Sequence, residues 1–226
     1  DLDRLYSLHS YNLEKHLRAV LQEKTTIKYT GSFKRGRLLP RNIYKVRTKE
    51  RRMYSKRINP DTPFHEVTFL VDESGSMQGD DGQRYINVYI ATYIINRACK
   101  RLGFKINYIS FDDEVRHRKS MADFRDFHGG GNDENAVLTY ANSVINIDNN
   151  NIIFILTDGG VSDYNSPRPM MAKFKKLGVE VIPIGVGISA GQANEFRRWY
   201  PDSVLADNMD AMVTAMATYL KKIIHR

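Results

Sequence analysis

The pattern of apolar and polar positions divides the chain into two unlike parts. From residue 66 onward, short apolar runs typical of strands alternate with longer stretches in which apolar residues recur at helical spacing. The strand-like runs are 66–71, 105–111, 152–156, 179–184 and 203–206, and the helix-like stretches are 84–102, 133–146, 168–177, 190–199 and 208–224. This alternation predicts an α/β fold with a doubly wound, mostly parallel sheet.

One strand of this sheet is expected to run the other way. The segment from Phe111 to Val115 contains Asp112, Asp113 and Glu114, which is typical of a tight turn. It predicts a short antiparallel strand at the edge of the sheet. We expect Asp112 and Asp113 to form only this turn.

The first 64 residues have a different pattern. Residues 2–22 have apolar side chains three, four and seven positions apart, which predicts an amphipathic helix, at least from Tyr11 onward. Residues 24–58 are interrupted by Gly31, Gly36 and Pro40, and we expect them to be irregular. They have too few apolar residues for a core of their own. The prediction is therefore a basic N-terminal helix and arm over 1–64, and an α/β domain over 65–226.

The positive charge of the chain lies in the arm. The net charge is +8, yet residues 1–65 hold 16 Lys and Arg against 6 Asp and Glu, while the remainder holds 18 against 20. An acidic protein segment is one expected partner of the arm, and a nucleic acid is a less favoured one, because no recognised nucleic-acid motif accompanies it. The arginines that would make such contacts are Arg37, Arg41, Arg47, Arg51, Arg52 and Arg57.

Composition narrows the function further. The single cysteine, Cys99, excludes an internal disulfide and a cysteine-rich zinc site, which favours a cytoplasmic protein. No apolar run approaches the roughly 18 residues of a membrane span, so no membrane association is expected. The chain also has no phosphate-binding loop of the GxxxxGK[ST] type, and we expect no ATP hydrolysis by the chain itself.

The segment from Val67 to Met77 has the strongest chemical signal. Its apolar run stops at Asp72, and hydroxyls follow at Ser74 and Ser76. These groups would lie at the carboxyl end of a buried strand, where open α/β sheets bind ligands. A carboxylate and two hydroxyls are oxygen donors, which suit a hard cation such as Mg²⁺ or Mn²⁺.

A second carboxylate repeats this arrangement. Asp158 follows the apolar strand 152–156, and a loop of three glycines leads to Asn132 near the start of a helix. Carboxylates on neighbouring strands would repel each other unless a cation lay between them. Ser74 and Ser76 would ligate directly, and the carboxylates directly or through water. One coordination position would remain open for a carboxylate of a partner.

These motifs resemble the metal-ion-dependent adhesion site of von Willebrand factor A domains. The resemblance rests on Asp72-x-Ser74-x-Ser76, the glycine-rich second loop and Thr157-Asp158-Gly159, and it covers residues 65–226. It implies a metal held by Asp72, Ser74, Ser76, Asn132 and Asp158. The family usually has a threonine ligand in the second loop, and Asn132 stands nearest that place here.

A further resemblance extends into the arm. Gly36-Arg37-Leu38, Arg41 and the basic run 47–57, followed by 69–77, are similar to the C-terminal part of the CobT subunits of aerobic cobalt chelatase. This resemblance implies a non-catalytic role, in which the chain couples an AAA+ ATPase of the MoxR or CobS type to a target such as a cobalt-chelatase complex. The alternative is a nucleic-acid-binding protein that uses the arm, with the A domain as a scaffold.

Overall fold

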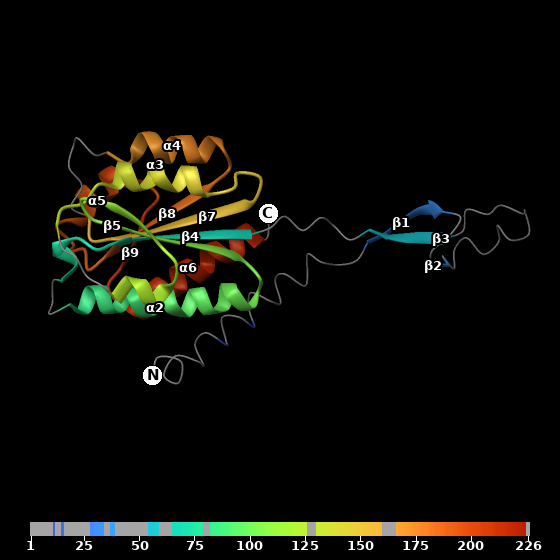
Figure 1. Ribbon diagram of the computed structural model, residues 1–226, viewed down its shortest axis with the longest axis horizontal. Coiled ribbons are helices and arrows are strands. Elements are labelled where there is room, and N and C mark those ends of the chain that lie inside the picture. The colour runs from blue at the N-terminus through green and yellow to red at the C-terminus, as the bar shows by residue number, and fades with distance from the viewer. Residues whose placement is uncertain are drawn as a thin grey trace, which may run out of the picture.

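The computed structural model describes Tyr11, Lys15 and residues 28–33, 37–38, 54–58, 65–78, 82–125, 130–159 and 166–224. Most of them form a sheet between two helical layers (Figure 1). The predicted α/β fold is therefore confirmed, and it begins at residue 65, at the first residue of the sheet.

The sheet has six strands in the order β6-β5-β4-β7-β8-β9. The parallel strands are β4 (His65–Asp72), β5 (Lys105–Phe111), β7 (Asn150–Thr157), β8 (Glu180–Val186) and β9 (Val204–Ala206). Strand β6 (Val115–Arg118) pairs antiparallel with β5 at one edge, as predicted. The carboxyl ends of β4 and β7 meet in register, because Val71 lies opposite Leu156.

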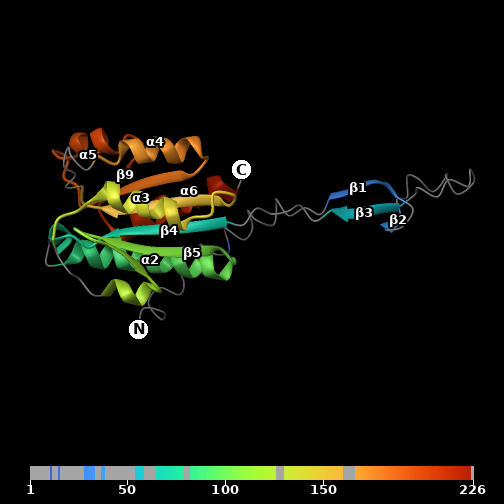
Figure 2. The ribbon, with the colours of Figure 1, turned by 45° about the horizontal axis from the view of Figure 1, so that its top comes forward.

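Helices cover both faces of the sheet. Figures 1 and 2 show α3 (Glu134–Val144) and α4 (Arg168–Lys176) on the face opposite α2 (Gln83–Arg101). The helix α6 (Met209–Ile224) packs with α2, and α5 (Ala193–Trp199) packs with α3 and α4. Two 3₁₀ turns, η2 (Gly75–Gln78) and η3 (Met121–Arg125), complete the layers.

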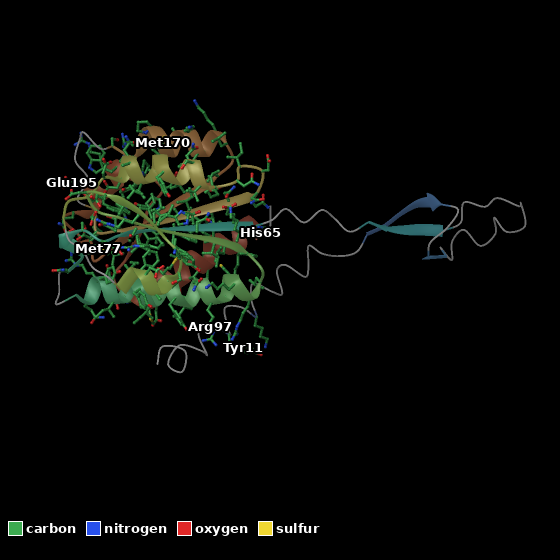
Figure 3. The ribbon with its side chains drawn as sticks, viewed as in Figure 1. Tyr11, His65, Met77, Arg97, Met170 and Glu195 are labelled. Atoms are coloured by element: carbon green, nitrogen blue, oxygen red, sulfur yellow. The ribbon has the colours of Figure 1, made fainter. Side chains whose placement is uncertain are left out.

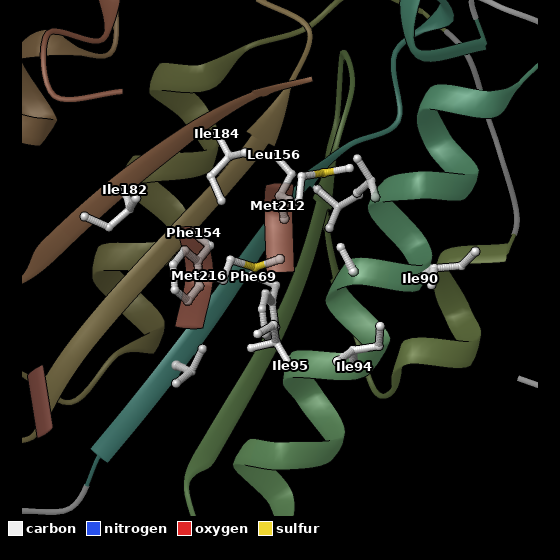
Figure 4. Close-up of a cluster of buried hydrophobic side chains, with 14 of the residues drawn as sticks. Phe69, Ile90, Ile94, Ile95, Phe154, Leu156, Ile182, Ile184, Met212 and Met216 are labelled. Atoms are coloured by element: carbon white, nitrogen blue, oxygen red, sulfur yellow. The ribbon is translucent and has the colours of Figure 1, made fainter. Parts of the chain in front are cut away.

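The central strands are mostly apolar because both of their faces are buried. Phe69 of β4 packs with Phe154 of β7 towards α2 and α6, as Figure 4 shows, whereas the next residue, Leu70, faces the core under α3. Successive side chains of a strand point to opposite faces, so a strand between two helical layers is apolar on both faces except where a buried polar side chain finds a hydrogen-bond partner, as Asn107 does with Glu66 and Thr68. This is the physical reason for the mostly apolar runs.

One helix starts later than the sequence pattern predicts. The pattern gave a helix over 190–199, but α5 begins at Ala193. The Ser189 hydroxyl donates to Gln192 Oε1 at 2.7 Å, and the Ala193 N–H donates to the Ser189 carbonyl. These bonds close a turn ahead of the helix, and such local side-chain bonding competes with helix formation.

The arm contains a small sheet that the sequence analysis did not predict. Strands β1 (Lys28–Phe33), β2 (Arg37–Leu38) and β3 (Tyr54–Ile58) pair antiparallel in the order β1-β3-β2, with an irregularity in β1 between Thr30 and Phe33. The prediction that residues 24–58 are irregular is therefore wrong. Strands this short leave little period-two pattern, and their pairing comes from backbone hydrogen bonds that any residue type except proline can make.

The structure describes only two of the six arm arginines that are expected to contact a partner. Arg37 lies in β2 and Arg57 in β3. Arg41, Arg47, Arg51 and Arg52 lie outside the described residues, as does the predicted helix 2–22 apart from Tyr11 and Lys15, which are helical. Among the helices of the described ranges, none has the length and apolarity needed to cross a membrane.

Candidate metal centre

Asp72 is the fixed point of the site. It is the last residue of β4 and is fully buried. Its Oδ1 accepts the Ser74 N–H at 2.8 Å, and its Oδ2 accepts the Thr157 hydroxyl at 2.6 Å. The first bond shapes the turn after the strand, and the second ties that turn to the neighbouring strand β7. The orientation of the Asp72 carboxylate is thus set before any ligand arrives.

Ser74 and Ser76 form a chain of hydrogen bonds from the turn after Asp72 to Asp158. The hydroxyls of Ser74 and Ser76 lie 3.0 Å apart, and the Ser76 hydroxyl donates to Asp158 Oδ1 at 2.9 Å. We call Asp72, Ser74, Ser76 and Asp158 the oxygen cluster. The structure therefore brings together four of the five residues expected to hold a metal.

The glycine-rich loop is fastened beside this cluster. The Gly75 N–H donates to the Gly130 carbonyl at 3.1 Å, and the Gly131 N–H donates to Asp113 Oδ1 at 3.0 Å. Gly130 has φ +122°, and a Cβ there would lie 2.7 Å from Asp113 Oδ2, so only glycine fits. Asp113 thus anchors the second loop, and the expectation that it serves only the hairpin turn is wrong.

Asn132 follows the glycine-rich loop and bonds to Glu134. Its Nδ2 donates to Glu134 Oε1 at 3.1 Å, and within the described ranges no hydrogen bond joins Asn132 to the oxygen cluster. Because the amide nitrogen is engaged by Glu134, the amide oxygen is the atom left to face a cation. The metal-binding role of Asn132 stays a prediction.

Four charged residues at this site were not predicted from the sequence: Arg84, Arg118, Glu73 and Glu134. Arg84 Nη1 lies 3.3 Å from Asp158 Oδ2, and Arg118 Nη2 lies 2.8 Å from Glu73 Oε2. Glu134, the first residue of α3, is fully buried, and its Oε2 has no hydrogen-bond partner among the described residues. Glu73 occupies a position that the DxSxS motif leaves open, so no motif could have identified it.

Buried negative charge accumulates here. Burial raises the pKa of Asp72 to about 6 and the pKa of Glu134 to about 7, and the neighbouring carboxylates add to both shifts. Burial and the charges of Glu134 and Asp72 also raise the pKa of the Tyr200 hydroxyl. A site with this electrostatic character is stabilised by a positive charge.

The spacing of the oxygen cluster fits a small divalent cation. Ligands at about 2.1 Å from Mg²⁺ in an octahedron lie about 3.0 Å from their nearest neighbours. The two distances along Ser74, Ser76 and Asp158 are 3.0 and 2.9 Å. Within the described part of the chain, no group of three or more His, Cys, Asp or Glu is arranged to hold a metal. A metal here would therefore depend on serine hydroxyls together with the two carboxylates.

The raised pKa values predict that the metal-free protein loses stability as the pH rises. The folded state holds protons on Asp72 and Glu134 that the unfolded chain releases near its ordinary values of 3.8 and 4.5. Stability from these groups is therefore full below about pH 4 and falls up to about pH 7, by about 3 kcal/mol for Asp72 alone. Urea unfolding in EDTA at several pH values measures this loss.

The Asp72→Asn variant is the control for that measurement. It removes the titrating carboxylate at nearly constant shape, so its stability should fall less over the same pH range. Saturating Mg²⁺ should flatten the wild-type curve, because a cation favours the ionised carboxylate. Parallel pH curves for wild type and variant in EDTA would contradict the prediction.

The fold and the site define the class of protein: an α/β domain with an oxygen-lined site at the carboxyl edge of its parallel sheet. The sequence profile of the von Willebrand factor type A domain matches residues 66–199, which is more than half of the chain. The chain belongs to this family.

Solved structures agree on the fold. Proximal thread matrix protein 1 from the mussel byssus has 20% identity and a TM-score of 0.54, over 71% of this chain and 46% of that one. BatB from Bacteroides thetaiotaomicron has 16% identity and a TM-score of 0.54, over 71% and 99%. The pilus adhesin SpaC from Lactobacillus rhamnosus GG has 15% identity and a TM-score of 0.57, over 73% of this chain and 31% of SpaC.

This chain thus matches less than half the length of the mussel protein and of SpaC. Another structure of the mussel protein, with 16% identity and a TM-score of 0.53 over 72% of this chain and 46% of that one, is described as having a zinc-occupied MIDAS motif. No curated protein matches the chain.

Proposed function

We propose that this protein is a protein-binding module that depends on a divalent cation, Mg²⁺ or Mn²⁺. The observation that carries the proposal is the spacing of about 3 Å along Ser74, Ser76 and Asp158, next to the buried Asp72. Asn132 would add its amide oxygen or hold a ligand water. The zinc reported for the mussel protein supports a divalent metal at this place in the family.

Some residues of the site hold its shape, and others face solvent. Asp72 and Thr157 hold the turn in place from below, where both are buried. Ser76 is exposed, whereas only 5% of the Asp158 side chain is exposed, so the accessible side of the site lies over Ser76. A cation bound here would offer a Lewis-acid position to a carboxylate of another protein. The side chains of the site would orient the cation and leave its solvent side open to the carboxylate.

We further propose that the partner is an AAA+ ATPase of the MoxR or CobS type. The support is the resemblance of the arm and of 69–77 to CobT subunits. In this role the domain at 65–226 couples the ATPase to a target such as a cobalt-chelatase complex, and an acidic segment of the partner contacts the basic region 1–64. Binding and coupling, with no chemical step of its own, is the role proposed for the chain.

Removal of the metal is expected to abolish partner binding. In a pull-down with the ATPase, binding should be lost in EDTA and restored by Mg²⁺, because the partner carboxylate would then have no cation to bind. Asp158→Asn should weaken binding about tenfold or more, in line with the loss of a charged ligand.

Asp202→Asn is the matched control for Asp158→Asn. Asp202 is 79% exposed and its carboxylate is 4.0 Å from Lys175, so the same change there should leave binding unaltered. Isotherms with Mg²⁺, Mn²⁺ and Zn²⁺ on the protein alone identify the preferred ion. Partner binding that persists in EDTA would contradict the coupling mechanism.

A further inference from the structure

The Arg84 guanidinium lies at the rim of the oxygen cluster, where its positive charge would repel a bound cation. Arg84, the second residue of α2, places Nη1 3.3 Å from Asp158 Oδ2, and 28% of its side chain is exposed. Figure 1 shows that α2 begins at the end of the molecule where β4 and β7 end. The charge of Arg84 therefore occupies the accessible side of the proposed metal site.

The Arg84 side chain also lies against the backbone just after β8. Gly187 follows β8 with φ +63°, and a Cβ there would lie 2.8 Å from Arg84 Nε. Arg84 thus lies directly against Gly187. Contact with Gly187 on one side and with Asp158 on the other holds the guanidinium beside the cluster.

A pocket of about 290 Å³ adjoins the guanidinium. Its walls include Ser76, Arg84, Asp158, Gln192, Glu195 and Phe196. Figure 3 shows Glu195 at the same end of the molecule as Met77, which follows the cluster directly. The pocket is open to solvent and large enough for one side chain of a partner.

We propose that Arg84 makes this site selective for carboxylate ligands, an inference that rests on the proposed metal-dependent function. A carboxylate has two oxygens, and a planar guanidinium is suited to donate a hydrogen bond to one of them while the other faces a cation. Arg84 also repels the cation, because its positive charge is held next to Asp158. The bare site consequently holds a metal less tightly than the cluster alone would, and the site gains affinity when a carboxylate enters.

The two effects of Arg84 have opposite signs, and this makes them testable together. Mn²⁺ is titrated into wild type, Arg84→Gln and Arg97→Gln, and an acetylated Gly-Glu-Gly amide is then titrated into each Mn²⁺-saturated protein. Arg84→Gln should bind Mn²⁺ about threefold or more tightly and the peptide about tenfold more weakly, by loss of one charge-assisted hydrogen bond. The Gly-Gln-Gly peptide should bind none of the proteins.

Arg97→Gln is the matched control, because it removes the same charge from the same helix. Its Nη1 lies 3.4 Å from the Tyr93 hydroxyl, and Figure 3 shows it away from the end that holds Met77 and Glu195. It should match wild type in both titrations. Arg84→Lys keeps the charge without the planar fork, so it should retain wild-type Mn²⁺ affinity and recover only part of the peptide affinity.

The outcomes separate this inference from the proposed function. Absence of Mn²⁺ binding by wild type would overturn the metal-dependent function, and the role of Arg84 with it. Normal Mn²⁺ binding, with equal peptide affinity in wild type and Arg84→Gln, would overturn the role of Arg84 alone. Unchanged or weaker Mn²⁺ binding by Arg84→Gln would overturn its opposition to the cation.

Discussion

Replacement of Asp72 with alanine is expected to abolish divalent-cation binding, with a loss of about 100-fold or more in affinity. Asp72 contributes the one fully buried carboxylate of the oxygen cluster, and its Oδ1 bond to the Ser74 N–H shapes the turn that presents both serines. The substitution therefore removes a charged ligand and loosens two others. Calorimetric titration with Mg²⁺ and Mn²⁺ measures the loss.

The Asp72→Asn variant separates charge from shape. It keeps an oxygen in place but no negative charge, so it should also lose the cation. In EDTA at pH 7.5 it should be at least as stable as wild type, because burial raises the pKa of Asp72 to about 6 and makes the ionised form costly. Equal metal affinity in wild type and both variants would contradict a role of Asp72 in metal binding.

Replacement of Arg118 with methionine is expected to destabilise the fold by about 3–5 kcal/mol, the usual cost of removing one partner of a buried ion pair. Glu73 is fully buried, and the Arg118 side chain is only 14% exposed. Arg118 Nη2 lies 2.8 Å from Glu73 Oε2, and its Nε donates to the Ser110 hydroxyl. Chemical unfolding at neutral pH measures the effect.

The double variant Glu73→Gln with Arg118→Met tests whether the uncompensated charge is the cause. It should recover much of the lost stability, since the double variant buries neither charge of this ion pair. Glu114→Gln provides the exposed comparison: its carboxylate is 3.1 Å from Arg116 and 76% exposed, so the change should be below about 1 kcal/mol. Similar losses for the single and double variants would rule out this explanation.

The ion pair also bears on binding. Glu73 lies between Asp72 and Ser74, so its attachment to β6 fixes the turn from the opposite side to Thr157. We therefore expect Arg118→Met to weaken metal binding even where the domain remains folded.

Local sequence patterns predicted most of the fold because they reflect burial. The strand at 105–111 was predicted with its observed bounds, and β4 and β7 differ from prediction only at their ends. A strand buried on both faces is apolar at most positions, and such a run is visible without any partner. The three strands of the arm lack this signal, and they were missed.

The sequence by itself determined the α/β order, the antiparallel edge and the four members of the oxygen cluster. These follow from short-range patterns: apolar runs, and oxygen donors placed where strands end. Only the tertiary structure decided which groups meet across long separations. Ser76 bonds to Asp158 82 positions away, Arg84 meets Asp158 across 74, and Arg118 meets Glu73 across 45. Such pairs depend on strand order and loop closure, which place side chains together without leaving a periodic trace in the chain.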